Sequence, residues 1–176
     1  MTDSINPIWP VLLGGSLSLA GSCGATWWAK HLERLHLERQ LARAIKGELL
    51  AMTHISNARA YTTGLRNAVQ QMQATNQAVL FYATVAEDFA RVFKANADKI
   101  GLLKGSLPAD IAITYSLISS VVVDLNDMGE LVKNPEMPGQ RDADSLIRKY
   151  QAMIDLTDDA MERAATIIKK IERLYP

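Results

Sequence analysis

The residues best suited to binding a metal ion are three histidines in the first third of the chain: His31, His36 and His54. Glu33 and His36 have the i, i+3 spacing with which a helix presents a carboxylate and an imidazole to a metal in carboxylate-bridged helical bundles. Such a site needs a second Glu-x-x-His pair on another helix, and the sequence contains none. We therefore predict no metal centre and no cofactor, and expect the histidines on helix surfaces or at a membrane interface.

Motifs for nucleophilic catalysis or phosphate binding are also missing. The sequence has no His-Glu-x-x-His, no Gly-x-Ser-x-Gly and no phosphate-binding glycine loop. Cys23 is the single cysteine, which excludes an intramolecular disulfide, and it has no neighbouring base to activate its thiol. Because 19 basic residues balance 19 acidic ones, the chain does not resemble a strongly basic nucleic-acid binder. We predict a protein that is not an enzyme and binds no nucleic acid.

An uncharged stretch covers residues 8–29 (IWPVLLGGSLSLAGSCGATWWA). A helix of this length reaches about 33 Å, enough to cross a hydrocarbon core of about 30 Å. Trp9 lies at one end and Trp27-Trp28 at the other, where indole rings prefer the headgroup boundaries. We predict a transmembrane helix over residues 8–29, after a short outside tail of residues 1–7.

Three other interpretations of this stretch compete with a transmembrane helix. A cleaved secretory signal needs basic residues before the apolar run, whereas residues 1–7 contain only the acidic Asp3. A lipoprotein signal ending at Cys23 lacks the same basic region, and the apolar run continues beyond the cysteine. A buried core helix of a soluble protein remains open, because glycine and serine make the stretch only moderately hydrophobic.

The flanks of the stretch predict its orientation. Lys30 and Arg34 follow the stretch, together with Arg39, Arg43 and Lys46, and no basic residue precedes it. Positive flanks remain in the cytoplasm. We therefore expect a bacterial inner (plasma) membrane protein with its N-terminus outside and residues 30–176 in the cytoplasm, anchored at the interface by Trp9, Trp27, Trp28, Lys30 and Arg34.

Small residues recur along one face of the expected span: Gly14, Gly15, Ser18, Gly21 and Ser22. In lipid, close backbone approach over such faces is a main source of helix association. We expect a partner in the membrane, either another membrane protein or a second copy. The alternative is a span that faces lipid alone.

Apolar residues keep a helical spacing through residues 30–176, which predicts a bundle. We expect the first helix to continue to about Gln73, a second over residues 76–101, a third from Ser106–Asp110 and a fourth from about Asp144, with a loop at 134–142. The predicted fold is all-α: one N-terminal transmembrane helix continuing into a cytoplasmic antiparallel bundle of about four helices. The polar stretch 56–78 is either a hydrogen-bonded helix face or a hinge near Thr62–Gly64.

Residues 92–103 (VFKANADKIGLL), followed by Leu107-Pro108 and Tyr115, resemble a pattern in small uncharacterised bacterial proteins with one N-terminal span and a helical cytoplasmic domain. The resemblance implies no activity. From the residues themselves we expect a helix corner. Gly101 would stop the second helix, Leu102 and Leu103 would fold back onto its last turn, and Asn96 and Asp98 would bond the backbone of the turn.

These observations favour a non-enzymatic accessory or scaffold subunit that assembles through its span and its helical domain into a larger membrane complex or a homo-oligomer. A membrane-anchored signalling or regulatory module that binds a cytoplasmic partner is the first alternative. An enzyme with an unrecognised metal site is the second. Whether the protein binds a small molecule is not predicted.

Overall fold

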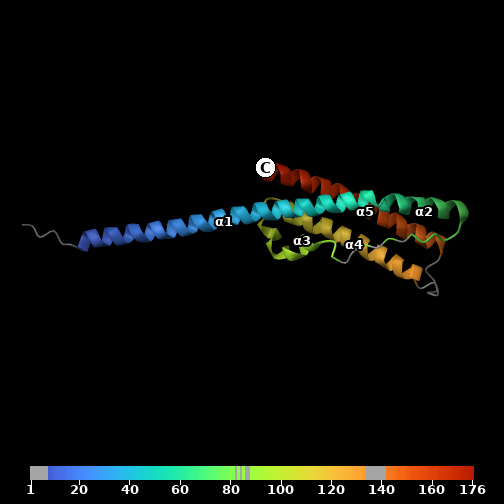
Figure 1. Cartoon of the computed structure of the whole chain (residues 1–176), viewed down its shortest axis with the longest axis horizontal. Helices are drawn as coiled ribbons and strands as arrows, with labels where there is room; N and C mark the ends of the chain where they lie inside the picture. Colours follow the sequence, from blue (N-terminus) through green and yellow to red (C-terminus); the bar gives the residue numbers. More distant parts are fainter. Residues whose placement is uncertain (1–7, 82, 84, 86–87, 134–141) are drawn as a thin grey trace, which may run out of the picture. The chain divides into compact units, whose positions relative to one another are not determined.

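The structure, a computed structural model, describes residues 8–81, 83, 85, 88–133 and 142–176, with side chains from Ala25 onward except Leu131. The described residues form helices and no strand, which confirms the all-α prediction (Figure 1). The elements are α1 (Ile8–Ala58), α2 (Tyr61–Thr75), α3 (Arg91–Ala95), the 3-10 helix η1 (Ala97–Leu102), α4 (Leu107–Lys133) and α5 (Ala143–Leu174). The chain divides into two compact units, residues 1–40 and 41–176.

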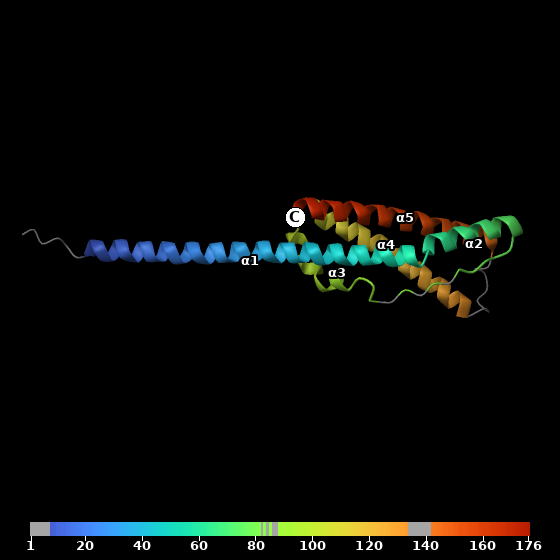
Figure 2. The same cartoon turned by 45° about the horizontal axis from the view of Figure 1, so that its top comes forward.

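The antiparallel pair of α4 and α5 forms the centre of the second unit (Figure 2). Lys170 Nζ lies 2.7 Å from Asp110 near the start of α4, and Lys149 Nζ lies 3.5 Å from Asp124 farther along. The side chain of Asp142 caps α5 by accepting a hydrogen bond from the backbone N–H of Ser145 (3.1 Å). The helices predicted from Ser106–Asp110 and from Asp144 are therefore confirmed.

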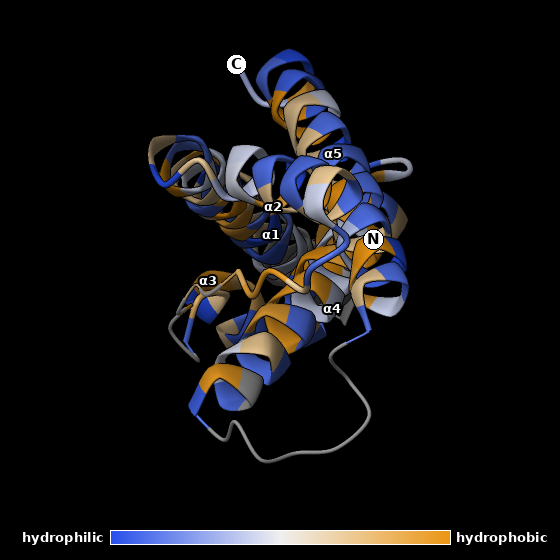
Figure 3. Cartoon of the chain, turned by 90° about the vertical axis from the view of Figure 1, so that its right-hand side faces the viewer, coloured by the Kyte–Doolittle hydropathy of each residue, from blue (hydrophilic) through white to orange (hydrophobic). Residues whose placement is uncertain are grey.

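The predicted apolar stripes of these two helices face the interior. The stripe of α4 is buried throughout: Ile111, Tyr115, Ile118, Val122 and Leu125. In α5, Leu146, Tyr150, Met153, Ile167 and Ile171 are buried, whereas Met161, Ile168 and Leu174 are half-buried. Hydropathy colours accordingly alternate along both ribbons (Figure 3).

Within the described residues, Leu107–Glu130 of α4 is the segment long and apolar enough to cross a membrane by length and composition. The central helix of a folded bundle satisfies the same criterion, and α4 contributes its stripe to the core. Hydropathy alone therefore does not distinguish a span from a core helix here. The predicted layout, with a span over residues 8–29, remains a prediction.

The prediction of one unbroken helix to Gln73 is wrong. α1 ends at Ala58, and Ala60 adopts the left-handed conformation (φ 51°) before α2 begins at Tyr61. Both helices nevertheless face α5: Lys46 pairs with Glu172 at 2.8 Å, and Arg66 pairs with Asp158 at 2.6 Å. Two helices, α1 and α2, therefore cover the stretch for which one continuous helix was predicted. Thr62–Gly64 lie in the first turn of α2 rather than at the break.

The prediction of a helix over residues 76–101 is also wrong. Asn76 ends α2 in the left-handed conformation (φ 53°), and the described residues from Gln77 to Val85 are not helical. The chain then forms only the short α3 and η1. The physical reason is in the sequence VLFYATV at 79–85, whose β-branched and aromatic residues favour extended backbone over helix. In the described residues, non-helical chain followed by the two short helices α3 and η1 thus replaces the predicted second helix.

Two cores lie on either side of a small middle cluster. The α1 core gathers buried residues of α1, η1, the first half of α4 and the second half of α5, including Ile45, Leu49, Ile111 and Ile171. The α2 core gathers buried residues of α2, the last turns of α4 and the first half of α5, including Leu65, Met72, Met128 and Met153. The middle cluster is formed by three residues: Ile118, Val122 and Ala160.

Candidate functional site

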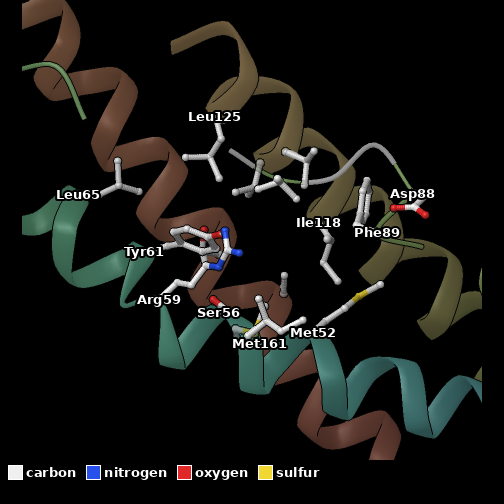
Figure 4. A pocket seen from close by; sticks show the side chains of 16 residues that line it. Met52, Ser56, Arg59, Tyr61, Leu65, Asp88, Phe89, Ile118, Leu125 and Met161 are labelled. Carbon is white, nitrogen blue, oxygen red and sulfur yellow. The ribbon is translucent and has the colours of Figure 1, made fainter. Parts of the chain in front are cut away.

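An apolar cavity of about 360 Å³ lies beside the middle cluster, where α1 ends and α2 begins (Figure 4). Its walls come from α1, α2, α4, α5 and the chain around Phe89. The lining residues are Met52, Ile55, Ser56, Arg59, Tyr61, Leu65, Val85, Asp88, Phe89, Ile118, Val121, Val122, Leu125, Thr157, Ala160 and Met161. This volume falls at the small end of the range of about 300–1,000 Å³ for small-molecule sites.

The cavity exists because the helix break coincides with short side chains on the opposing helices. The backbone of α2 lies close to that of α5, whereas that of α1 keeps a greater distance from α4 and α5 in the described residues. Across from this gap, Val122 and Ala160 are too short to fill it. The cavity therefore borders the α2 core, whose Leu65, Val121 and Leu125 line it, as well as the middle cluster.

Polar groups sit at two separate sides of the cavity. On one side, Arg59 Nη1 donates a hydrogen bond to the hydroxyl of Tyr61 (3.1 Å). On the other side lie Phe89 and Asp88, whose carboxylate pairs with Arg91 Nε at 3.1 Å (Figure 4). The cavity therefore has two polar ends, Arg59 with Tyr61 and the ion pair of Asp88 with Arg91, and apolar walls between them.

The hydroxyl of Thr157, which also lines the cavity, is already satisfied because it donates to the carbonyl of Met153 (2.7 Å). Among the described residues, no buried side-chain nitrogen or oxygen lacks a hydrogen-bond partner. The buried polar atoms of the described walls are therefore all paired, and most of the lining side chains are apolar. An apolar occupant matches them best.

A second polar arrangement, in the α1 core, holds the short helix α3 in place. The carboxylate of Glu48 accepts hydrogen bonds from the backbone N–H groups of Val92 (2.7 Å) and Phe93 (3.0 Å) at the start of α3. It also accepts one from the hydroxyl of Tyr115 (2.6 Å), whose ring stacks on Phe93 with 4.2 Å between centroids. Burial, and then the hydrogen bond to Glu48, raise the pKa of Tyr115 far above its ordinary value.

Two further tyrosine hydroxyls hold chain outside the regular helices. The Tyr150 hydroxyl accepts from the backbone N–H of Phe81 (2.8 Å) and donates to the carbonyl of Val79 (3.1 Å). The Tyr175 hydroxyl accepts from the backbone N–H of Lys104 (2.9 Å). Burial raises the pKa of Tyr150, and the Phe81 hydrogen bond opposes that shift. These tyrosines fasten the backbone rather than face an open site.

The predicted interface residues lie in the first unit. Trp27, Trp28, Lys30 and Arg34 are all exposed, and the ring of His31 stacks on that of Trp27 with 5.6 Å between centroids. Trp9 and the small residues Gly14, Gly15, Ser18, Gly21 and Ser22 fall within α1, but their side chains lie outside the described residues. The predicted packing face therefore stays a prediction.

The predicted helix corner is built differently from the expectation. Gly101 lies inside η1 with open space beside it, and the left-handed glycine of this region is Gly105 (φ 63°). The Asn96 side chain donates to the carbonyl of Val92 (2.9 Å), whereas Asp98 is exposed. Leu103 is buried and Leu102 is half-buried.

Sequence reasoning missed the cavity and the role of Glu48. Glu48 carried a detectable signal, since it lies three residues after Ile45 and four before Met52, on the apolar stripe of α1. An acidic residue on such a stripe needs buried hydrogen-bond donors. The cavity carried no comparable signal, because its walls come from segments far apart in the sequence. In the part of the chain that the structure describes, no three His, Cys, Asp or Glu side chains are placed to hold a metal.

Comparisons of the chain with protein-family models, with curated proteins and with solved structures return no match, so function is inferred here from the residues and their geometry.

Proposed function

We propose that the protein is a non-enzymatic, membrane-anchored accessory or scaffold subunit of the bacterial inner membrane. Residues 8–29 would cross the bilayer with the N-terminus outside, and residues 30–176 would form the cytoplasmic part. Assembly would use the small-residue face of the span and the helical domain. The partner would be another membrane protein or a second copy of the chain.

The observation that carries this proposal is the exposure of two adjacent tryptophans. Trp27 is 66% exposed and Trp28 is 59% exposed, at the junction between the uncharged stretch and the basic residues Lys30 and Arg34. Exposed indole rings beside basic side chains suit the headgroup region, where one part of the ring meets lipid and the other meets water.

A face of α4 supports the assembly part of the proposal. Residues 111–123 contain no charge, although only one side of this segment faces the core. On the outer side Ile113 is 47% exposed and Val123 is 57% exposed, with exposed serines between them. An uncharged, solvent-facing helix surface of this length suits contact with another protein.

Topology can be tested because Cys23 is the single cysteine. In a Cys23→Ser background, a cysteine is introduced by Ser4→Cys or by Ser145→Cys, and intact cells are treated with a membrane-impermeant maleimide. We expect labelling of the Ser4→Cys chain in intact cells and of the Ser145→Cys chain only after lysis. Recovery of the chain in the soluble fraction after carbonate extraction would contradict the proposal.

The assembly step is tested in the full chain by replacing Gly14, Ser18 and Gly21 with leucine. On an ideal helix Ser16 and Ala20 lie on the opposite side, so the Ser16→Leu, Ala20→Leu pair is the matched control. We expect the first set to abolish cross-linked complexes in native membranes and the control to preserve them. Equal yields from both sets would argue against association through this face.

The helix break favours the regulatory module as the second candidate function. Ala60 has a left-handed backbone, an arrangement that costs free energy and that occurs at switch regions. A change in the angle between α1 and α2 would carry a signal along the chain. Capture of one specific soluble protein by residues 31–176, with the span removed, would favour this candidate over the scaffold.

A further inference from the structure

We propose that the cavity at the end of α1 binds the alkyl chain of a long-chain carboxylate, such as a fatty acid, with the carboxylate held by Arg59 and Tyr61. All lining residues lie between Met52 and Met161. The proposal therefore does not rest on a membrane span.

The walls select an alkyl chain. Aliphatic side chains from α1, α2 and α4 cover most of the surface, together with the ring of Phe89. Met52 and Met161 contribute flexible thioether side chains, which adapt to chains of different length (Figure 4). A polar group placed against these apolar walls would lose its hydration, and the hydroxyl of Thr157 already donates its proton to the carbonyl of Met153.

The polar end formed by Arg59 and Tyr61 selects a carboxylate and orients it. The guanidinium of Arg59 is a planar fork that matches a carboxylate. The Tyr61 hydroxyl accepts a hydrogen bond from Arg59, so its own proton is positioned for an acceptor such as a carboxylate oxygen. At the opposite end the carboxylate of Asp88 is paired with Arg91 (3.1 Å) and has no proton to donate to an anionic headgroup. The donors at the other end therefore favour one orientation, with the ligand carboxylate at Arg59 and Tyr61.

The test is photolabelling of the purified full-length protein in lipid nanodiscs with dodecanoic acid that carries a terminal diazirine. Labelled peptides are identified by mass spectrometry. We expect adducts on peptides that contain Met52 or Met161 and others lining the cavity. Unlabelled dodecanoate should compete for these adducts, whereas the dodecyltrimethylammonium cation should not. Competition should strengthen by about fourfold per added methylene until the cavity is full.

Two kinds of variant sharpen the test. Arg59→Gln should weaken competition by dodecanoate about tenfold and leave competition by neutral dodecanol unchanged, because dodecanol makes no charged hydrogen bond with Arg59 that the substitution could remove. Arg148→Gln makes the same change at an exposed residue of α5 outside the cavity and should have no effect. Ala160→Phe should abolish cavity labelling, whereas Ala165→Phe, at an exposed position of the same helix, should preserve it.

Helical content and thermal unfolding are measured for each variant. If Ala160→Phe fails to fold, Val122→Met fills part of the same space with a smaller change and should shorten the preferred chain. Adducts confined to residues 8–29 would overturn the proposal, because they report chains dissolved in lipid. Equal competition by the cation, or full labelling of folded Ala160→Phe, would also overturn it. If the protein does not insert into membranes, the proposed function is wrong but the cavity proposal is unaffected. The same photolabelling is then carried out on the protein in solution without lipid.

Discussion

The α1 core and the α2 core solve the same structural problem with different chemistry. Each must hold part of the chain between α2 and α4 against the long helices, and each uses a buried tyrosine hydroxyl to do so. In the α1 core Tyr115 acts through the carboxylate of Glu48, which gathers three donors. In the α2 core Tyr150 bonds directly to backbone groups of Val79 and Phe81.

The difference teaches where the fold depends on charge. A carboxylate that accepts several hydrogen bonds binds its partners more strongly than neutral groups do, but its removal leaves all of those donors unpaired. A neutral tyrosine hydroxyl between two backbone groups stabilises the fold less, and its removal lowers the free energy of unfolding less. We therefore expect the α1 core to be the more sensitive of the two to single polar substitutions.

The largest expected effect is that of Glu48→Ala, which should lower the free energy of unfolding by about 3 kcal/mol because two backbone N–H groups and one hydroxyl lose their acceptor. Urea unfolding of the full chain in detergent, followed by circular dichroism at 222 nm, measures the change. Glu172→Ala removes a half-exposed carboxylate paired with Lys46 and should cost about 0.5 kcal/mol. Similar losses in the two variants would mean that Glu48 does not organise the α1 core.

Gly64→Ala tests the α2 core. A Cβ atom at Gly64 would overlap the ring of Phe81, whose backbone N–H is bonded to Tyr150. Moving the ring should cost about 2 kcal/mol. Gly47→Ala is the matched control on α1, where a Cβ meets open space, and it should stabilise by about 1 kcal/mol. The same unfolding assay distinguishes the two variants. If both substitutions raised the free energy of unfolding, or both lowered it, the close packing of Phe81 on α2 would be refuted.

Alkaline pH should distinguish the two tyrosines. The folded protein holds the pKa of both hydroxyls above the ordinary value near 10, so the unfolded chain loses these protons first. Stability is complete below about pH 10 and falls above it, by up to about 1.4 kcal/mol per pH unit for each tyrosine. Because the pKa shift is larger for Tyr115, Tyr115→Phe should reduce the loss of stability with rising pH more than Tyr150→Phe does. Unfolding midpoints between pH 8 and pH 11.5 give the slopes, and identical slopes would argue against a stronger anchor in the α1 core.

The smallest expected effect is at the junction of the two cores. Ala60 has a left-handed backbone that glycine adopts without strain, so Ala60→Gly should stabilise the fold by about 0.5 kcal/mol. The same substitution within a helix, Ala44→Gly, should destabilise it by about 1 kcal/mol. Differential scanning calorimetry would reveal the opposite shifts. A loss of stability in both variants would mean that the left-handed turn is not retained.

The cores differ in how far the sequence predicted them. Helical spacing was sufficient for α4 and α5, because each carries a continuous apolar stripe and α5 begins with a capping aspartate. The same reasoning failed over residues 76–101, where the backbone groups of Val79 and Phe81 bond to the Tyr150 hydroxyl instead of forming a helix. The spacing of apolar residues does not distinguish such a segment from a helix, because both can bury the same side chains. They differ in the partners of their backbone hydrogen bonds, which the spacing does not show.

The sequence by itself determined the helical class, the two long helices of the central pair and an uncharged stretch long enough to cross a bilayer. It also determined the absence of recognisable catalytic motifs. These properties are local, since periodicity, capping and hydropathy act within one segment.

The tertiary structure alone decided where the first helix breaks, what replaces the predicted second helix, and which residues meet around the cavity. Each of these depends on groups from distant parts of the chain: Glu48 with Val92, Phe81 with Tyr150, and Arg59 across from Asp88. Such pairings are set by how side chains of several segments fill a shared volume, and no single segment carries that information.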